Sequence, residues 1–551
     1  MPSAALSLPT DPNELHAEVL RLHDRLAESE RQRAVQQQEH EQRIEQLLDY
    51  ITLLKRKRFG PSTDRIPADQ LKLFDEAELE ALIAELEGEV EQPTAPPAQQ
   101  PPPEKPKKKP VRRPLPEHLP RVERIVDLPD SEKQTMGSDW TFIGYDESEQ
   151  LAVIPRQPYV IVFKRAKYVP LNEDVPGAEQ GVVIAPRAPQ LLPKAIGHGS
   201  LIADVVVGKF VDALPLYRQE KIFAREGIEL SRQTMAGWMI QLDAKLTPLM
   251  AAMKELFYEG HVVHIDETRL QVLEEPGREA DQQSYMWVYV GGTPERPVVW
   301  YQYADTRGGE VPQQFLSPSE TEPPGADPPP WIFYILTDGY SGYNALAREA
   351  MVIGHAACWA HVRRKFVEAA AGRKNTAAAH QMVALIRKLY GIERGIRDHT
   401  PQQRKVVRAA QSKPLLEKIK AWLDEKAPHV LPKGLLGKAI AYTLGLWPLL
   451  TTFLEDGHLE LDNNVAENAI RPFVVGRKNW LFSGSPRGAQ ASATLYSLIE
   501  SAKANALEPR AYLTYLFERL PEASSPEAIA SLLPQNLNAK DLKLNVEALN
   551  L

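Results

Sequence analysis

The sequence predicts a multidomain α/β protein whose central domain is a mixed β-sheet interrupted by a helical insertion. Its 551 residues exceed what one hydrophobic core usually organises, so several domains are expected. Five segments between residues 261 and 358 are rich in β-branched and aromatic residues, as strands are. The first sixty residues instead space their apolar side chains as a coiled coil does. The composition, 43% hydrophobic and 25% charged, is that of an ordinary globular protein.

Composition also limits the classes of protein that remain. The one cysteine, Cys358, excludes intrachain disulfides and zinc sites built from paired cysteines. The sequence has no run of about eighteen apolar residues and no basic-then-apolar start, so we expect no membrane contact and a cytoplasmic location. The net charge of -8 conceals basic clusters at 105–113, 363–365 and 471–478, which leave a basic face for nucleic acid.

Residues 1–59 are predicted to form a helical oligomerisation segment like a coiled coil. Between Leu26 and Ile44 lie two heptads plus four residues, which indicates a stutter. The alternative is one long amphipathic helix packed on its own chain; we favour association into a homo-oligomer. The apolar seam is Leu15, Val19, Leu22, Leu26, Ile44, Leu47, Ile51 and Leu54.

Residues 60–120 combine a short acidic helix with a proline-rich linker, which proline keeps extended. The linker ends in a basic run that either contacts DNA phosphates or is simply solvated. Residues 121–190 show strand-like pieces and predict a small β domain. The members of the basic run are Lys107, Lys108, Lys109, Arg112 and Arg113.

Residues 195–255 predict a helix-turn-helix from three helical segments at 200–213, 215–227 and 231–246. In the third segment Met235, Trp238, Met239 and Leu242 recur at helical spacing and form a buried stripe. The alternative to DNA recognition is plain helix packing. The side chains left outside the stripe for DNA contact include Arg232, Gln233 and Thr234.

The central domain is predicted to begin at 256–365, where strands are expected at 261–273, 284–292, 297–304, 332–339 and 351–358. Residues 366–457 are helical in pattern and form an insertion. The domain resumes at 458–490, and 491–551 are expected to be a helical tail.

Asp266 and Asp338 each end an apolar run, so both carboxylates are expected at the tips of buried strands. Paired carboxylates suit Mg²⁺, a hard cation that prefers oxygen ligands. Glu467 follows in a segment that Asn463 or Asn464 would cap as a helix, and a third carboxylate would complete a two-metal site. Taken alone, an Asp at a strand end is more often a turn former, and a Glu at a helix start more often a partner of the helix dipole. The nearby cations Arg471, Arg477 and Lys478 favour a phosphate-rich substrate.

Six motifs in this order resemble the insertion sequence 66 family of bacterial DDE transposases: HIDET, LTDGYSGYN, CWAHVRRKF, DNNVAENAIRP, GRKNWLFSGS and YSLIESAKANALEPRAYL. The resemblance runs from about Arg58 to Pro534. It implies a ribonuclease-H-like catalytic core with the triad Asp266, Asp338 and Glu467. It also implies two Mg²⁺ ions per active site, with Mn²⁺ able to substitute, and double-stranded DNA, both transposon ends and target, as the partner. A bacterial, nucleoid-associated location and small accessory proteins from the same element are further implications.

Four other residues of the matched motifs lie near the predicted triad. Cys358 and His361, with His355 one turn earlier, are expected on one helix; we favour packing or hydrogen bonding over a metal site for them. Asp462 and Asn463 are expected to orient Glu467.

The small β domain departs from the family pattern. Relatives usually carry a four-cysteine zinc module there, and this chain has Lys133, Met136, Pro170 and Glu173 at the aligned positions, so no zinc is expected. Apolar residues would have to hold the domain together, namely Val153, Ile154, Val160, Ile161, Val162 and Phe163.

The leading hypothesis is a transposase that binds the ends of its element and cleaves and transfers DNA strands. The first alternative is a catalytically inactive DNA-binding or regulatory derivative. The second is a ribonuclease-H-like nuclease without strand transfer.

Overall fold

A computed structural model describes residues 16, 23, 25–33, 158–169, 182–317, 331–371 and 378–542 of the chain. It divides into two compact units, one of residues 1–92 with 189–551 and one of residues 93–188. Residues 25–33 are helical, and Leu26 is 60% exposed. The remainder of the predicted coiled-coil seam and the basic run 107–113 lie outside the described residues.

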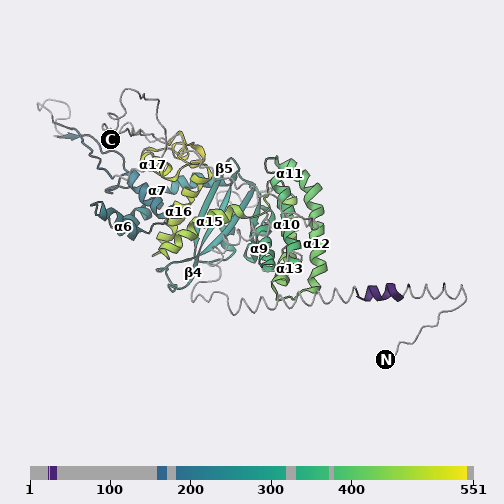
Figure 1. Cartoon of the computed structure of the whole chain (residues 1–551). Coiled ribbons are helices and arrows are strands. Elements are labelled where there is room, and N and C mark those ends of the chain that lie inside the picture. Colours follow the sequence, from purple (N-terminus) through teal and green to yellow (C-terminus); the bar gives the residue numbers. More distant parts are fainter. Residues whose placement is uncertain are drawn as a thin grey trace, which may run out of the picture. The chain divides into compact units, whose positions relative to one another are not determined.

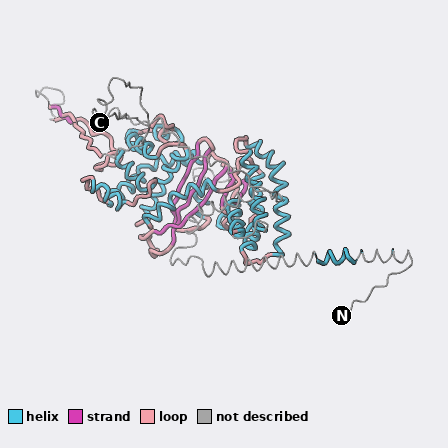
Figure 2. Tube along the Cα trace, in the orientation of Figure 1, coloured by secondary structure: helices cyan, strands magenta, loops and turns pink. Residues whose placement is uncertain are grey.

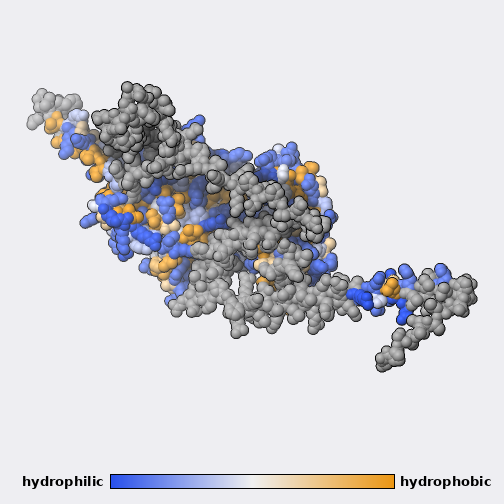
Figure 3. All heavy atoms as spheres, in the orientation of Figure 1, coloured by the Kyte–Doolittle hydropathy of each residue, from blue (hydrophilic) through white to orange (hydrophobic). Residues whose placement is uncertain are grey.

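The smaller unit contains a two-stranded antiparallel sheet, β1 (Lys167–Tyr168) with β2 (Val183–Ile184). The prediction that apolar side chains hold this unit is wrong for four of its residues. Val160, Ile161, Val162 and Phe163 are 86%, 40%, 71% and 59% exposed. Their segment carries hydrophobic side chains on its surface (Figure 3). Strand-like composition therefore does not produce a buried layer in this segment.

Three helices follow as predicted: α5 (Gly199–Phe210), α6 (Leu216–Arg225) and α7 (Arg232–Phe257). The Ser231 side chain caps α7 by accepting from the Thr234 amide. Met235, Trp238, Met239 and Leu242 are buried, while residues 232–234 are exposed. The helix extends eleven residues beyond its predicted end, through Pro248, because its buried stripe continues to Phe257.

A five-stranded mixed sheet forms the centre of the larger unit (Figure 1). The strand order is β5-β4-β3-β6-β7, with antiparallel pairing on the β3–β4–β5 side and parallel pairing from β3 through β6 to β7. All five predicted strands are present. Their bounds are β3 Val262–Gln271, β4 Gln283–Thr293, β5 Arg296–Ala304, β6 Phe333–Thr337 and β7 Val352–Ala357.

The predicted helical insertion forms a second hydrophobic core beside β6 and β7, which contribute Leu336 and Ala356 to it. Figure 2 shows these helices standing together next to the sheet. Arg408 is fully buried there, because Glu393 and three main-chain carbonyls accept its hydrogen bonds. The helices are α9 Trp359–Ala370, α10 Ala378–Gly395, α11 Pro401–Val407, the π-helix η5 Arg408–Ser412, α12 Lys413–Lys426, α13 Leu435–Gly445 and α14 Trp447–Thr451.

The last part of the chain, which was expected to be a helical tail, forms helices that pack on the rest of the larger unit. Helix α16 (Pro486–Ala504) lies along β5, where the Ser501 and Ser497 hydroxyls accept from the amides of Val299 and Tyr301. The helix therefore satisfies backbone groups of an edge strand that would otherwise be unpaired. The remaining helices are α8 Glu310–Leu316, α15 Asn464–Trp480, α17 Pro509–Arg519 and α18 Pro526–Ala530, with short 3-10 turns at Ser341–Asn344, Leu346–Arg348, Ala427–His429, Thr452–Leu454, Leu520–Glu522 and Pro534–Asn536.

Three predicted domain boundaries fall inside helices. Residues 255 and 256 both belong to α7, 365 and 366 to α9, and 490 and 491 to α16. Each of these helices therefore continues from one predicted domain into the next.

Candidate active site

Strand pairing brings Asp266 and Asp338 together. The parallel register of β3 and β6 pairs His264 with Leu336. Two residues further along the two strands, this register sets Asp266 beside Asp338. The prediction that both acids end a strand is right for Asp338, which follows Thr337, the last residue of β6. It is wrong for Asp266, because β3 continues to Gln271 in antiparallel pairing with β4.

Glu467 reaches the site from the first turn of α15. Asn463 is the N-cap residue, but its side chain makes no cap hydrogen bond, contrary to the sequence prediction. The amide instead donates to the Ile265 carbonyl at 2.9 Å and accepts from the His264 ring nitrogen Nδ1 at 3.1 Å. Burial lowers the pKa of His264 to about 4, which keeps the ring neutral at physiological pH. Asn463 thus attaches the start of α15 to the strand that carries Asp266.

Asp462 is held by neighbours other than Glu467. One of its oxygens accepts from the Asn464 amide at 3.2 Å, and the other accepts from the Tyr390 hydroxyl at 2.9 Å. Asp462 therefore fixes the helix start against the helical insertion, since Tyr390 lies on α10.

The site concentrates negative charge out of water. Burial raises the pKa of Asp266 well above its usual value, and the neighbouring Glu267, Asp338 and Glu467 raise it further. Burial also raises the pKa of Glu467. Carboxylates that repel one another in a buried setting are stabilised by a cation between them. This donor set of oxygens fits divalent ions of the Mg²⁺ type.

Glu267 is a fourth acid in the site that already has partners. The Arg307 guanidinium forms an ion pair with it, and the Tyr343 hydroxyl donates to its carboxylate. Arg307 also stacks over the Tyr340 ring at 3.9 Å. Glu267 therefore has an ion-pair partner and a hydrogen-bond donor from the protein, although burial and the neighbouring Asp338 still raise its pKa.

Cys358 and His361, for which packing or hydrogen bonding was expected, contact Glu467, a partner that the sequence did not predict. The Cys358 thiol lies 3.8 Å from Oε1 of Glu467, and the His361 nitrogen Nδ1 lies 3.3 Å from the same oxygen. Among the described residues, the ligand atoms of these three lie within 4.8 Å of one another, whereas those of the three triad acids do not. The wider spacing of the triad would suit a pair of divalent ions, since two-metal sites hold ions about 3.5–4 Å apart.

His355 does not join this group. It lies on β7 and not on the predicted helix, and its Nε2 bonds the Thr337 hydroxyl at 2.7 Å. Cys358 is the N-cap residue of α9, so only Cys358 and His361 share the start of that helix.

The basic residues divide into buried and accessible ones. Arg477 is 5% exposed, and its guanidinium donates to the Thr268 hydroxyl at 3.1 Å, so direct DNA contact by Arg477 does not fit the structure. Arg471 and Lys478 are half-buried on the same helix. Arg364, which belongs to the basic cluster 363–365 but was not predicted as a site residue, lies 3.5 Å from Oε2 of Glu467. Its position in the RR pair of CWAHVRRKF was the available signal.

The site consists of two neighbouring aspartates on a mixed sheet and a glutamate on a helix. Carboxylate clusters of this kind are typical of metal-dependent phosphoryl-transfer enzymes. Residues 194–491 match the family described as Transposase IS66 family, residues 497–535 its C-terminal element, and residues 46–124 the description "Transposase C of IS166 homeodomain". The chain belongs to the IS66 family of transposases. The homeodomain description falls on residues where the sequence analysis expected the end of the oligomerisation segment, the acidic helix and the linker.

Relatives from Sinorhizobium fredii (strain NBRC 101917 / NGR234) cover most of the chain. The uncharacterized protein y4qI is 31% identical over 96% of this chain and 97% of its own length. The uncharacterized protein y4jD is 32% identical over 77% of this chain and 81% of its own length. Within the described residues, no helix is both long and apolar enough to span a bilayer.

Proposed function

We propose that this transposase binds the ends of its insertion sequence and cleaves and transfers DNA strands at Asp266, Asp338 and Glu467. The observation that carries the proposal is the register of β3 and β6, which sets Asp266 beside Asp338 in a half-buried cluster of carboxylates whose mutual repulsion raises the pKa of Asp266. The strand order and the helix-borne glutamate support a ribonuclease-H-like core.

Asp266, Asp338 and Glu467 would hold two divalent ions, Mg²⁺ or Mn²⁺. Such ions lower the pKa of an attacking water or 3′-hydroxyl and stabilise the leaving oxygen. The protein's own residues align the parts: Asn463 fixes α15 against β3, and Arg364 and His361 hold the Glu467 carboxylate in place before ions bind. Arg307 forms an ion pair with Glu267, so this fourth acid already has a cationic partner in the protein.

Binding of the element ends is assigned to the exposed start of α7, where Arg232, Gln233 and Thr234 face solvent. The Arg232 amide donates to Glu220 of α6, so the two helices hold this end in a fixed position. The basic residues Lys107, Lys108, Lys109, Arg112 and Arg113 would add phosphate contacts, which make affinity fall steeply with salt. Pairing of two ends would use the segment 1–59 as the self-association element.

The deciding experiment incubates the full chain with Mg²⁺ and labelled element-end DNA and follows nicked and joined products. Asp338→Asn should abolish both products while gel-shift binding in EDTA stays within a fewfold of the parent. Asp305→Asn is the matched control, because Asp305 is an exposed acid outside the site. If Asp338→Asn nicked at the parent's rate, the metal assignment would be wrong. A parent that binds ends without nicking would support the inactive derivative, and nicking without joining would support a nuclease.

A further inference from the structure

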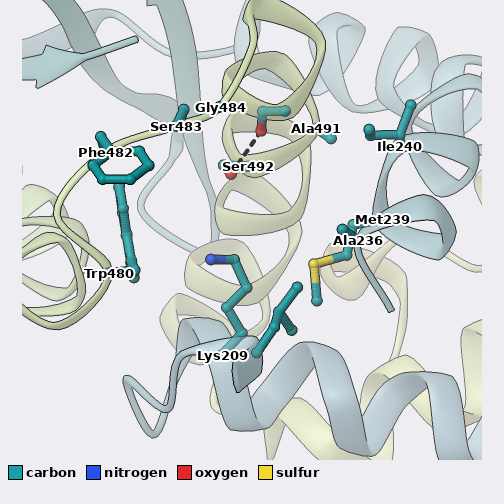
Figure 4. Close-up of a pocket in the computed structure, with 12 residues that line it drawn as sticks. Lys209, Ala236, Met239, Ile240, Trp480, Phe482, Ser483, Gly484, Ala491 and Ser492 are labelled. Atoms are coloured by element: carbon teal, nitrogen blue, oxygen red, sulfur yellow. Dashed lines mark hydrogen bonds between the residues drawn. The ribbon is translucent and has the colours of Figure 1, made fainter. Parts of the chain in front are cut away.

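A pocket lies between α5, α7, the end of α15 and the start of α16 (Figure 4). Its lining includes the long side chains of Lys209, Trp480 and Phe482. Small residues such as Gly484, Gly488 and Ser492 also line it. The motif GRKNWLFSGS, which the triad leaves unexplained, supplies the aromatic wall. We propose that this pocket binds one unstacked nucleotide of the DNA strand, an inference that rests on the proposed function for the identity of its ligand.

The backbone is strained at the centre of this motif. Leu481 has φ 69° and ψ -51°, and the Phe482 amide donates to the Trp480 carbonyl at 2.9 Å. This is a classic γ-turn, a rare and strained conformation for a residue other than glycine. Strain of this kind persists where the surroundings enforce it and clusters at functional sites. The γ-turn ends α15 at Trp480 and places Trp480 and Phe482 on either side of Leu481.

The two aromatic side chains of the pocket differ: Trp480 is held by packing, and Phe482 is accessible. Trp480 packs edge-to-face against the Phe473 ring, with ring centres 5.4 Å apart. Phe482 is 43% exposed although it lines the pocket. A fixed indole beside an exposed phenyl ring forms a platform on which a base can stack, whatever the base is.

Lys209 supplies a positive charge without a carboxylate partner in the part of the chain that the structure describes. Its ammonium lies 5.0 Å from the centre of the Trp480 ring and 5.3 Å from that of Phe210. Figure 4 shows the amino group reaching into the pocket. Burial lowers the pKa of Lys209 to about 8, which expresses the cost of keeping this charge out of water. A phosphate next to the stacked base would offset that cost.

The pocket is connected to the catalytic strand. Ser483 pairs with the extension of β3, since its amide donates to the Gln271 carbonyl at 2.9 Å and its carbonyl accepts from the Leu273 amide at 3.0 Å. Ser483 therefore sits about six residues beyond Asp266 along β3, or roughly 20 Å. A strand bound at both places would therefore span roughly 20 Å between the pocket and the phosphate at the triad.

A base that is still stacked in a duplex cannot enter such a pocket. Binding requires a single-stranded or frayed stretch, and unstacking costs least where pairing is already lost. The pocket would therefore select DNA whose strands have separated near the cleavage point, and it would not select a particular base.

The test compares two probes bound by the full chain in EDTA: a blunt 30-base-pair duplex and the same duplex with a single-stranded oligothymidine tail. The parent should bind the tailed probe about tenfold more tightly, as stacking of one base allows. Phe482→Ala and Lys209→Met should each remove that preference and leave binding to the blunt duplex unchanged. Matched controls are Val475→Ala, an exposed apolar side chain on α15, and Lys245→Met, an exposed lysine on α7. Neither residue lines the pocket.

A second measurement locates the contact. With 5-iodouracil in the tail, irradiation should crosslink the peptide that contains residues 479–484. Equal affinity of the parent for both probes, unchanged preference in both pocket variants, or crosslinks only to other peptides would overturn the proposal. Failure of the proposed function has a different signature: the parent would neither nick nor join ends, yet the tail preference and its loss in the variants would still support the nucleotide pocket.

Discussion

The side-chain amide of Asn463 donates to the main-chain carbonyl of Ile265 at 2.9 Å. Ile265 immediately precedes Asp266, and Asn463 lies four residues before Glu467, so this bond joins the two elements that carry two of the three acids. Asn463 is 1% exposed, and its amide hydrogen bonds span about 200 residues of chain. Asn463 therefore links the strand that carries Asp266 to the helix that carries Glu467.

Asn463→Ala should lower stability and activity together. It leaves the His264 ring N–H and the Ile265 carbonyl without partners, which costs about 1–3 kcal/mol. Strand cleavage should fall roughly tenfold to hundredfold, because small misplacements of catalytic groups are costly. Urea unfolding and a nicking assay across Mg²⁺ concentrations measure both effects. Asn464→Ala is the control, since Asn464 is exposed and only its backbone amide is bonded. Parent-like behaviour of Asn463→Ala would show that α15 is positioned by other contacts.

Asp266→Asn should stabilise the metal-free protein while destroying activity. The pKa of Asp266 is raised by burial and by three neighbouring acids, so its charge opposes folding at neutral pH. Removing the charge should raise the melting temperature in EDTA by roughly 2–4 °C. Adding Mg²⁺ should then raise the melting temperature of the parent and not that of the variant. Calorimetry with and without Mg²⁺ is the measurement, and a lower melting temperature of Asp266→Asn in EDTA would contradict the charge argument. Asp305→Asn should have the same melting temperature as the parent, both in EDTA and in Mg²⁺.

The serines of α16 should matter for stability and not for chemistry. Ser497→Ala and Ser501→Ala each leave a buried β5 amide without its acceptor, at a cost of about 1–3 kcal/mol per site. The double variant should unfold at clearly lower urea concentration, and its residual activity per folded molecule should equal the parent's. Ser531→Ala, whose hydroxyl bonds only within its own short helix, serves as the control. Unchanged unfolding of the double variant would mean that α16 holds β5 by packing alone.

His355 should make the protein less stable in mild acid. Burial lowers its pKa to about 4, below the value near 6.5 of an unfolded chain. Both states are neutral above pH 6.5; between pH 6.5 and 4 the unfolded chain binds a proton that the folded one excludes, so stability falls as pH falls. The full effect is about 3 kcal/mol.

The measurement for His355 is the difference in unfolding free energy between parent and His355→Gln at several pH values. Glutamine can still bond the Thr337 hydroxyl, so the difference isolates the titration. The parent should lose stability relative to the variant only below about pH 6.5. A difference that is constant with pH would show that His355 is not buried as a neutral ring. His399→Gln, at an exposed position, should show no trend.

Local periodicity in the sequence was enough to predict most of the secondary structure. The five strands were found from β-branched and aromatic runs, and the buried stripe of α7 from its spacing, because these patterns depend on which face of an element meets water. The same reasoning failed at residues 160–163, whose apolar side chains are exposed. It also ended α7 at Leu246, whereas the helix continues through Pro248 to Phe257 because its buried stripe continues.

Motif order in the sequence selected the three acids and the family, but only the tertiary structure decided how their neighbours are used. Cys358 and His361 meet Glu467 across more than a hundred residues, and Arg477 is directed inward to Thr268. Trp480 and Phe482, which flank the strained turn at Leu481, lie with Lys209 of α5 in the lining of one pocket. Such contacts depend on how helices and strands pack against one another, and a one-dimensional pattern records only the preferences within each element.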